Sequence, residues 1–331
     1  MKRNFFQYKQ LGVAATLLTS LYGHNVVAAE TPFTFITNWY AQAEHGGYYQ
    51  ALAEGLYKEQ GLDVTLRMGG PQINGTQLML AGQAQCVLTD DIGAMLANSR
   101  KIPVKLVATS FQFDPMVVIA HSDVETMDDL KSRTILISAS ANSSWWPWAK
   151  KKYGFTDDMT RPYTFNIQPF VLGQNIAQQG FMTSEPYSMK QAGADYKVFS
   201  LGKEGYPPYG NSISCHNDVI EKHPEQIAAF LKASMQGWKN FLTDPTAAKA
   251  LIKEDNPNMT DDQIDFSVDL LNSSGIVTSG DAQTMGIGVI TKARMEKTWQ
   301  MAVDNGLFDA DDVKIDQFYT TTLINQSPVL P

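Results

Sequence analysis

The chain has 331 residues, of which 44% are hydrophobic and 18% charged, a composition typical of a globular protein long enough for two domains. Its formal net charge is -8 and it has no basic run, which argues against nucleic acid or an anionic membrane surface as a partner. Two cysteines, Cys86 and Cys215, are too few for a disulfide scaffold, and the sequence leaves open whether they form one bridge or stay free.

The first 29 residues have the pattern of a secretory signal peptide. Lys2, Arg3 and Lys9 are basic, the apolar run LGVAATLLTSLYG follows, and small residues precede a predicted cleavage near Ala29. The run is too short to cross a bilayer, and nothing near it pairs with the pattern of a buried N-terminal helix, which is the alternative. We therefore expect a secreted protein that is soluble and periplasmic.

Apolar runs that predict strands then alternate with helical patterns. Strands are predicted at residues 33–37, 63–68, 86–89 and 104–109. Helices are predicted at residues 46–61, 73–83 and 92–101. Such alternation predicts β–α–β units, in which helices cover a parallel sheet.

A second series of the same kind begins near residue 115. Strands are predicted at residues 115–120, 134–139 and 196–201. Thr126 and Asp129 indicate a helix start close to a capping box. The tryptophan-rich segment 143–154 is predicted to be a helix with Ser143 or Ser144 as its N-cap. Beyond residue 211 the chain is predicted to be mostly helical, with helices at 223–242, 245–254, 261–273 and 291–305.

Two α/β series joined by short links predict two lobes with a ligand cleft between them. The links are predicted at residues 110–115 and 205–211. Lobe 1 is therefore expected to comprise residues 31–112 plus 212–331, and lobe 2 residues 113–211. Ligands of open α/β sheets bind beyond the carboxyl ends of the strands, so the loops that follow the strands are the candidate site.

One long segment, NWYAQAEHGGYYQALAEGLYKEQGLDV (38–64), resembles the opening of the NMT1/THI5-like family of solute-binding proteins. It has Asn38–Trp39 after a strand and His45 seven residues after Asn38. Shorter similarities are MGGP (68–71), LAGQAQCVLTDD (80–91) and SEPY (184–187). The resemblance implies a two-lobed periplasmic binding protein fold of type II, which delivers a small molecule to an ABC permease and its ATPase. Related branches of the family take pyrimidine precursors of thiamine, riboflavin, aliphatic sulfonates or nitrate.

The loops after the predicted strands are rich in aromatic rings and carboxylates and poor in cations. A sulfonate or nitrate site needs arginine, lysine or a helix N-terminus, whereas this set suits a flat, neutral or protonated heteroaromatic ring. A thiamine pyrimidine precursor fits the set. The alternatives are a flavin ring, as in riboflavin, or a sulfonate or nitrate anion bound at the helix start near Ser143 and Ser144. The candidate ligand-binding residues are Asn38, Trp39, Tyr40, His45, Gly69, Gly70, Thr89, Asp90, Phe111, Asn142, Ser144, Trp145, Trp146, Glu185 and Tyr187.

The specific hypothesis is that Trp39 and one of Trp145 or Trp146 sandwich the ring, while Glu185 or Asp90 accepts hydrogen bonds from it. Each residue also has a structural interpretation. The tryptophans of segment 143–154 could form core, with Trp148 packing inward and at least one of the other two facing the cleft. Asp90 could cap the following helix, His45 could order its loop, and Gly69 with Gly70 could form a tight turn.

Two further functions remain as alternatives. The family also covers fungal enzymes that make the thiamine pyrimidine; these carry a cysteine cluster and a histidine near the position of Gly93, and this chain has neither feature. No nucleophile-elbow or zinc-protease motif is present, so we expect a protein that is not an enzyme, with no cofactor and no metal site. A receptor that signals instead of transporting is the other alternative. We expect a monomer.

Overall fold

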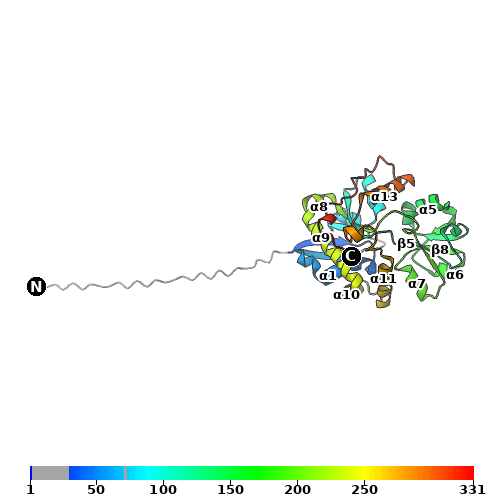
Figure 1. The fold of residues 1–331 in the computed structure, drawn as a ribbon, viewed down its shortest axis with the longest axis horizontal. Helices are drawn as coiled ribbons and strands as arrows, with labels where there is room; N and C mark the ends of the chain where they lie inside the picture. The colour runs from blue at the N-terminus through cyan, green and yellow to red at the C-terminus, as the bar shows by residue number, and fades with distance from the viewer. Residues whose placement is uncertain (2–29, 71–72) are drawn as a thin grey trace.

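The computed structural model describes residue 1, residues 30–70 and residues 73–331. The predicted signal peptide therefore lies outside the described residues. Figure 1 shows two groups of elements, with α1, α8, α9 and α10 on one side of the view and α5, α6, α7, β5 and β8 on the other. Within the described part of the chain, no helix combines the length and the apolar character needed to cross a membrane.

The first sheet has five strands in the order β2-β1-β3-β10-β4. Its strands are β1 (Thr31–Ile36), β2 (Leu62–Arg67), β3 (Cys86–Thr89), β4 (Val104–Phe111) and β10 (Gly210–His216). Strand β1 is parallel to β2 and β3, as predicted, but β10 is antiparallel to both β3 and β4. Strand β10 was not predicted, because Asn211, Ser212 and Ser214 are polar yet buried and the strand therefore has no apolar alternation.

Helices surround this sheet and make up most of the last third of the chain. They are α1 (Gly46–Ala53), α2 (Leu56–Glu59), α3 (Gly75–Leu80), α4 (Asp91–Ser99), α8 (Asn217–Lys222), α9 (Pro224–Thr243), α10 (Thr246–Asp255), α11 (Asp261–Ser274), α12 (Ala282–Met285) and α13 (Lys292–Asp304), with 3₁₀ helices η1 (Ala43–His45) and η5 (Ile324–Gln326). The single helix predicted at 46–61 is two helices, because Gly55 adopts a left-handed backbone with φ 75° that interrupts it.

The second sheet has the order β7-β6-β8-β5-β9. Its strands are β5 (Met116–Ala120), β6 (Thr134–Ile137), β7 (Thr160–Pro162), β8 (Ile176–Phe181) and β9 (Lys197–Ser200), and its helices are α5 (Trp145–Tyr153), α6 (Gln168–Leu172), α7 (Glu185–Gln191), η2 (Met127–Ser132), η3 (Ala139–Ser143) and η4 (Asp157–Met159). Strand β5 is antiparallel to β8 and β9, so this sheet is mixed as well. The predicted capping box is present, since Thr126 N–H donates to Asp129 Oδ2 at 2.8 Å, but it begins a 3₁₀ helix.

The tryptophans of α5 lie in the core of the second group of elements. Trp145 and Trp146 are only 2% and 1% exposed, and the indole N–H of Trp146 donates to Asp157 Oδ1 at 2.8 Å. The expectation that one of them faces the cleft is therefore wrong. The chain that follows α5 folds back over it and stacks Phe155 on Trp146 at 5.7 Å between ring centroids, so the face assumed to be open is covered. Ser144 is the N-cap residue of α5, as predicted, but its hydroxyl donates to the Ser140 carbonyl and makes no capping hydrogen bond to the helix.

Helices α1 and α9 approach each other through glycines. A Cβ atom on Gly237 would lie 2.2 Å from the carbonyl oxygen of Gly47, and a Cβ on Gly47 would lie 2.2 Å from the Trp238 ring. Real Cβ atoms do not approach other atoms so closely, and the nearest obstacle at Gly237 is backbone. The crossing therefore needs a residue without a side chain at this position.

We expect Gly237→Ala to lower the free energy of unfolding by about 1–3 kcal/mol through overpacking. Gly75→Ala is the matched control, because a Cβ there would meet Val87 at an ordinary 3.5 Å. That variant should be neutral or stabilised by about 0.4–1 kcal/mol, since alanine restricts the unfolded chain. Urea unfolding of both variants gives the comparison, and equal stabilities would contradict the close crossing.

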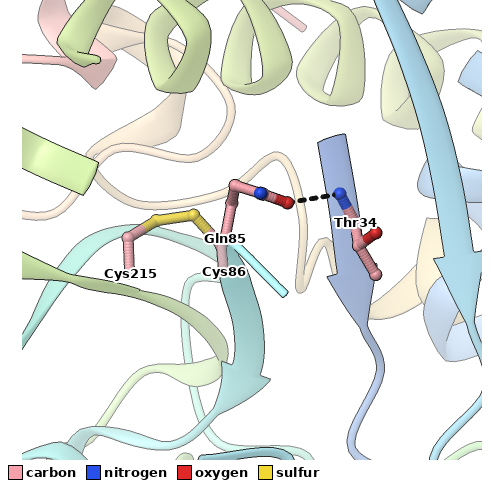
Figure 2. The surroundings of a disulfide bond; sticks show 4 residues. All are labelled: Thr34, Gln85, Cys86 and Cys215. Carbon is pink, nitrogen blue, oxygen red and sulfur yellow. Dashed lines mark hydrogen bonds between the residues drawn. A yellow bond between two sulfur atoms is a disulfide. The ribbon is translucent and has the colours of Figure 1, made fainter. Parts of the chain in front are cut away.

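A disulfide joins Cys86 on β3 to Cys215 on β10, which answers the question that the sequence left open (Figure 2). The two residues are register partners in the antiparallel pair, with Cα atoms 4.1 Å apart. Beside the bond, Gln85 Oε1 accepts from the backbone N–H of Thr34 at 2.6 Å. The bond and this contact tie β10 and β1 to opposite sides of β3.

Candidate functional site

A cavity of about 440 Å³ is formed by residues from both sheets and their following loops. Its volume lies within the range of roughly 300–1,000 Å³ that small-molecule pockets occupy. The first sheet contributes the loop after β1, η1 and the start of β10, while the second contributes the ends of β6, β7 and β8 and the start of α7. The lining residues are Asn38, Trp39, Tyr40, Gln42, Glu44, His45, Met116, Ser138, Ser140, Tyr163, Phe165, Ile167, Gln179, Gly180, Phe181, Ser184, Glu185, Ser188 and Asn211.

A chain of hydrogen bonds fixes the wall that the first sheet contributes. Asn211 donates from Nδ2 to the Glu44 carbonyl at 2.9 Å, and its Oδ1 accepts from Asn38 Nδ2 at 3.3 Å. Asn38 Oδ1 lies 2.9 Å from His45 Nε2 and, as an amide oxygen, accepts a hydrogen bond from it. The neutral ring therefore carries its proton on Nε2, and Nδ1 is an acceptor. Burial lowers the pKa of His45 to about 3, so the ring is neutral. Asn211 has φ 50°, a left-handed conformation that asparagine tolerates better than most residues.

Two carboxyl groups, one from each part of the wall, lie at the cavity. Glu44 is 2% exposed, its Oε1 accepts from the Thr183 hydroxyl, and burial raises its pKa to about 7. Glu185 accepts from the Tyr163 hydroxyl at 2.8 Å and from the Phe181 N–H at 2.7 Å, and burial raises its pKa too. Among the described lining residues there is no lysine or arginine. The cavity is therefore suited to a ligand that donates hydrogen bonds or carries positive charge.

Aromatic rings from both sheets meet at the rim of this cavity. The centroids of Trp39 and Phe165 are 5.0 Å apart with an interplanar angle of 40°. Tyr40 packs edge-on against Trp39 at 5.6 Å, and Tyr163 packs against Phe165 at 5.3 Å. Phe165 is 58% exposed and has φ 59°, which is uncommon for a bulky residue. Trp39 follows β1 and Phe165 follows β7, so the aromatic rings available for stacking at this rim come from the loops of both sheets.

The structure brings five of the predicted site residues to the cavity. These are Asn38, Trp39, Tyr40, His45 and Glu185. Four of them belong to the single loop from β1 to α1, and Glu185 begins α7. Their role in binding a ligand is a proposal that their position supports.

The other predicted site residues lie elsewhere. Trp145 and Trp146 are core, and Phe111 is fully buried with its ring edge-on to Trp238 at 5.6 Å. Asp90 is the N-cap of α4 and accepts a hydrogen bond from the Gly93 N–H at 2.6 Å. This is the capping role given above as the alternative to ligand binding. The remaining residues outside the cavity lining are Gly69, Gly70, Thr89, Asn142, Ser144 and Tyr187.

Local contacts explain these positions. Gly69 donates its N–H to Thr37 Oγ1 at 3.0 Å, and a Cβ on it would lie 2.1 Å from the Thr37 carbonyl oxygen, so it packs beneath the β1 loop. Thr89 pairs with Ser212 of β10 inside the sheet. Asn142 donates to the Ala139 carbonyl within η3, at 3.3 Å.

Several lining residues were not predicted. Glu44 stands inside the segment quoted for the family resemblance, directly before His45, and that adjacency was the available signal. Tyr163 and Phe165 follow β7, which has only three residues and two exposed positions and therefore no readable strand pattern. Asn211 was assigned to a link between lobes, and it reaches Asn38 from 173 positions away.

The comparisons with known sequences point to one family. The family described as NMT1/THI5 like matches residues 42–248. The riboflavin-binding protein RibY of Chloroflexus aurantiacus is 23% identical, over 65% of this chain and 64% of the relative. A formylaminopyrimidine-binding protein of Halalkalibacterium halodurans is 25% identical, over 64% of this chain and 66% of the relative. The 4-amino-5-hydroxymethyl-2-methylpyrimidine phosphate synthase THI5 of Saccharomyces cerevisiae is 24% identical, over 69% of this chain and 72% of the relative. The chain thus spans slightly less than two thirds of the first two relatives.

Solved structures establish the fold. The periplasmic aliphatic sulphonate binding protein SsuA from Escherichia coli superposes with a TM-score of 0.67 at 13% identity, covering 88% of this chain and 92% of that one. The alkanesulfonate-binding protein SsuA from Xanthomonas axonopodis pv. citri, bound to MOPS, superposes with a TM-score of 0.61 at 14% identity, covering 89% and 100%. The chain has the two-lobed type II periplasmic binding protein fold that was expected. Because the family match spans more than half of its length, this protein belongs to the NMT1/THI5-like family.

Proposed function

We propose that this protein is the periplasmic solute-binding component of an ABC importer and that it binds a small amino-substituted heteroaromatic ring, of the kind found in thiamine pyrimidine precursors. The observation that carries the proposal is the cavity itself, which combines aromatic rings at its rim with the buried carboxyls of Glu44 and Glu185. The protein is secreted through its N-terminal signal peptide, closes on the ligand as a monomer, and delivers it to the permease without chemical change.

The charge of the wall argues against the sulfonates bound by the proteins with a similar fold. A sulfonate or nitrate needs cationic or N–H donors, and two carboxyl groups in the wall oppose an anion. The short helix α7 begins at the cavity with Glu185 itself, which offsets any attraction of its N-terminus for an anion. A shared fold at 13% sequence identity does not imply that two proteins bind the same ligand.

Riboflavin is the second candidate ligand, because RibY is among the similar proteins. A flavin ring is flat and would also stack on an aromatic ring of the rim such as Trp39. The two candidates differ in the edges they present, since the aminopyrimidine offers an exocyclic amino group and the flavin offers mainly carbonyl acceptors. Two carboxyl groups in the wall favour the first.

Binding without chemistry is favoured over the synthase activity named for the yeast relatives. Gly93, near the position where the fungal enzymes have a histidine, lies in the first turn of α4 and is not a lining residue. The only two cysteines are joined in a disulfide, so neither offers a thiol. These features support a binding protein.

The test is a titration of the mature protein with hydroxymethyl-aminopyrimidine, its formylamino relative, thiamine, riboflavin, taurine and nitrate. Binding is read from tryptophan fluorescence and melting temperature together. A specific ligand at a hundred times its Kd adds about 2.7 kcal/mol to the free energy of unfolding. A response to taurine or nitrate alone would overturn the proposal.

Trp39 is expected to report this binding, since it is the one tryptophan of six that lines the cavity. Trp39→Ala should weaken ligand binding about tenfold or more, through lost stacking and lost burial of apolar area. Trp39→Phe should keep most of the affinity and lose the fluorescence response. Trp299→Phe is the control and should keep both, because the Trp299 indole donates to the Val313 carbonyl away from the cavity. An unchanged response in Trp39→Phe would place the ligand elsewhere.

A further inference from the structure

Glu44 has a position that stacking and overall charge do not explain. It lies in η1, after the first strand of the first sheet, but its Oε1 accepts from the hydroxyl of Thr183, which follows β8 of the second sheet. The Thr183 carbonyl in turn accepts from Ser267 Oγ of α11 at 2.8 Å. All three side chains are at most 2% exposed. We call Glu44, Thr183 and Ser267 the junction, because they connect elements of both sheets beside the cavity.

The carboxyl group of Glu44 has one oxygen available for a ligand. Thr183 donates to Oε1, the backbone N–H of Glu44 itself contacts the carboxyl group, and no other side chain of the described residues donates to Oε2. This oxygen is also not among the atoms sealed from solvent without a partner. Since Glu44 lines the cavity, the cavity is where Oε2 is accessible.

The groups around Glu44 indicate what kind of ligand its carboxyl group can bind. The charged or titratable groups nearby are Glu185, whose negative charge disfavours ionisation of Glu44, and His45, which is neutral. No described lining residue supplies a positive charge. Two carboxyl groups in one buried wall favour a ligand that brings N–H donors or a cation to them.

We propose that Glu44 is a specificity-determining residue that selects an N–H donor on the ligand and couples ligand occupancy to the junction between the lobes. The inference rests on the proposed function and deepens it. The ligand is a ring that presents at least two N–H donors or an amidinium-like cation, one to Glu44 and one to Glu185. A ring with a carbonyl at the edge that faces Glu44 would set two acceptors against each other and bind more weakly.

The experiment compares two probes, 4-amino-5-hydroxymethyl-2-methylpyrimidine and its 4-oxo analogue, by calorimetric titration. Wild type should bind the amino compound at least tenfold more tightly. In Glu44→Gln the affinity for the amino compound should fall at least tenfold and the preference should fall by a similar factor. Both affinities are measured on one preparation, so any loss of folded protein cancels from their ratio.

Ser267→Ala is the matched control, since it weakens the junction and Ser267 is not a lining residue. It should lower the affinity for both probes equally and leave their ratio unchanged. If Glu44→Gln also lowers both affinities equally, Glu44 is only a structural contact and the inference is overturned while the proposed function stands. If wild type binds neither probe, the proposed ligand class itself is overturned, and the inference with it.

Discussion

Removal of the Cys86–Cys215 disulfide is expected to lower the free energy of unfolding by about 3–5 kcal/mol. The two cysteines are 129 positions apart, so the bond closes a long loop in the unfolded chain and removes much of its conformational freedom. Both cysteines are fully buried in the centre of the first sheet, where β10 enters between β3 and β4. The bond thus secures the strand that is paired over the longest sequence distance in that sheet.

Urea unfolding of wild type with and without reductant, and of the double variant Cys86→Ala/Cys215→Ala, measures this effect. Reductant should shift the midpoint of wild type and leave the double variant unchanged. Neither cysteine lines the cavity, so the ligand Kd of the folded double variant should change less than about threefold. The prediction would be contradicted if the wild-type protein kept its stability after thiol titration had shown that the disulfide was fully reduced. A structural disulfide also fits a protein that leaves the cytoplasm.

Glu44→Gln is expected to make the ligand-free protein more stable than wild type at pH 8, by on the order of 3 kcal/mol. Burial raises the pKa of Glu44 to about 7, so the folded protein binds this proton more tightly than the unfolded chain. The stability that the proton contributes is fully present below about pH 4.5, the ordinary value, and is lost as the pH rises through 7. Glutamine is neutral throughout and avoids the cost of a buried charge.

The measurement is the difference in unfolding free energy between variant and wild type at pH 5 and pH 8. The difference should be small at pH 5 and large at pH 8. Glu221→Gln, at an exposed position on α8, should follow wild type at both pH values. A variant that gains stability and loses ligand preference would show that Glu44 is retained for binding, since active sites commonly sacrifice stability for function. A difference that does not vary with pH would contradict the raised pKa.

Much of the fold follows from local patterns in the sequence. Strands β1 to β6 were predicted within a few residues of their observed ends, because apolar runs bounded by turn residues are a local signal. The loop from Asn38 to His45 was also identified, since a strand followed by polar and aromatic residues places them at a carboxyl edge. The sequence by itself thus determined part of one wall of the cavity, namely Asn38, Trp39, Tyr40 and His45, and the α/β class.

Tertiary structure decided the rest, for reasons of distance along the chain. Strand β10 is a strand because β3 and β4 flank it, and its buried serines carry no apolar pattern. Trp146 is core because Phe155 and Asp157 return to cover it, which helical periodicity does not show. Glu44 meets Thr183 from 139 positions away, across the two sheets. Such pairings depend on how two lobes close on each other, and no window of local sequence contains both partners.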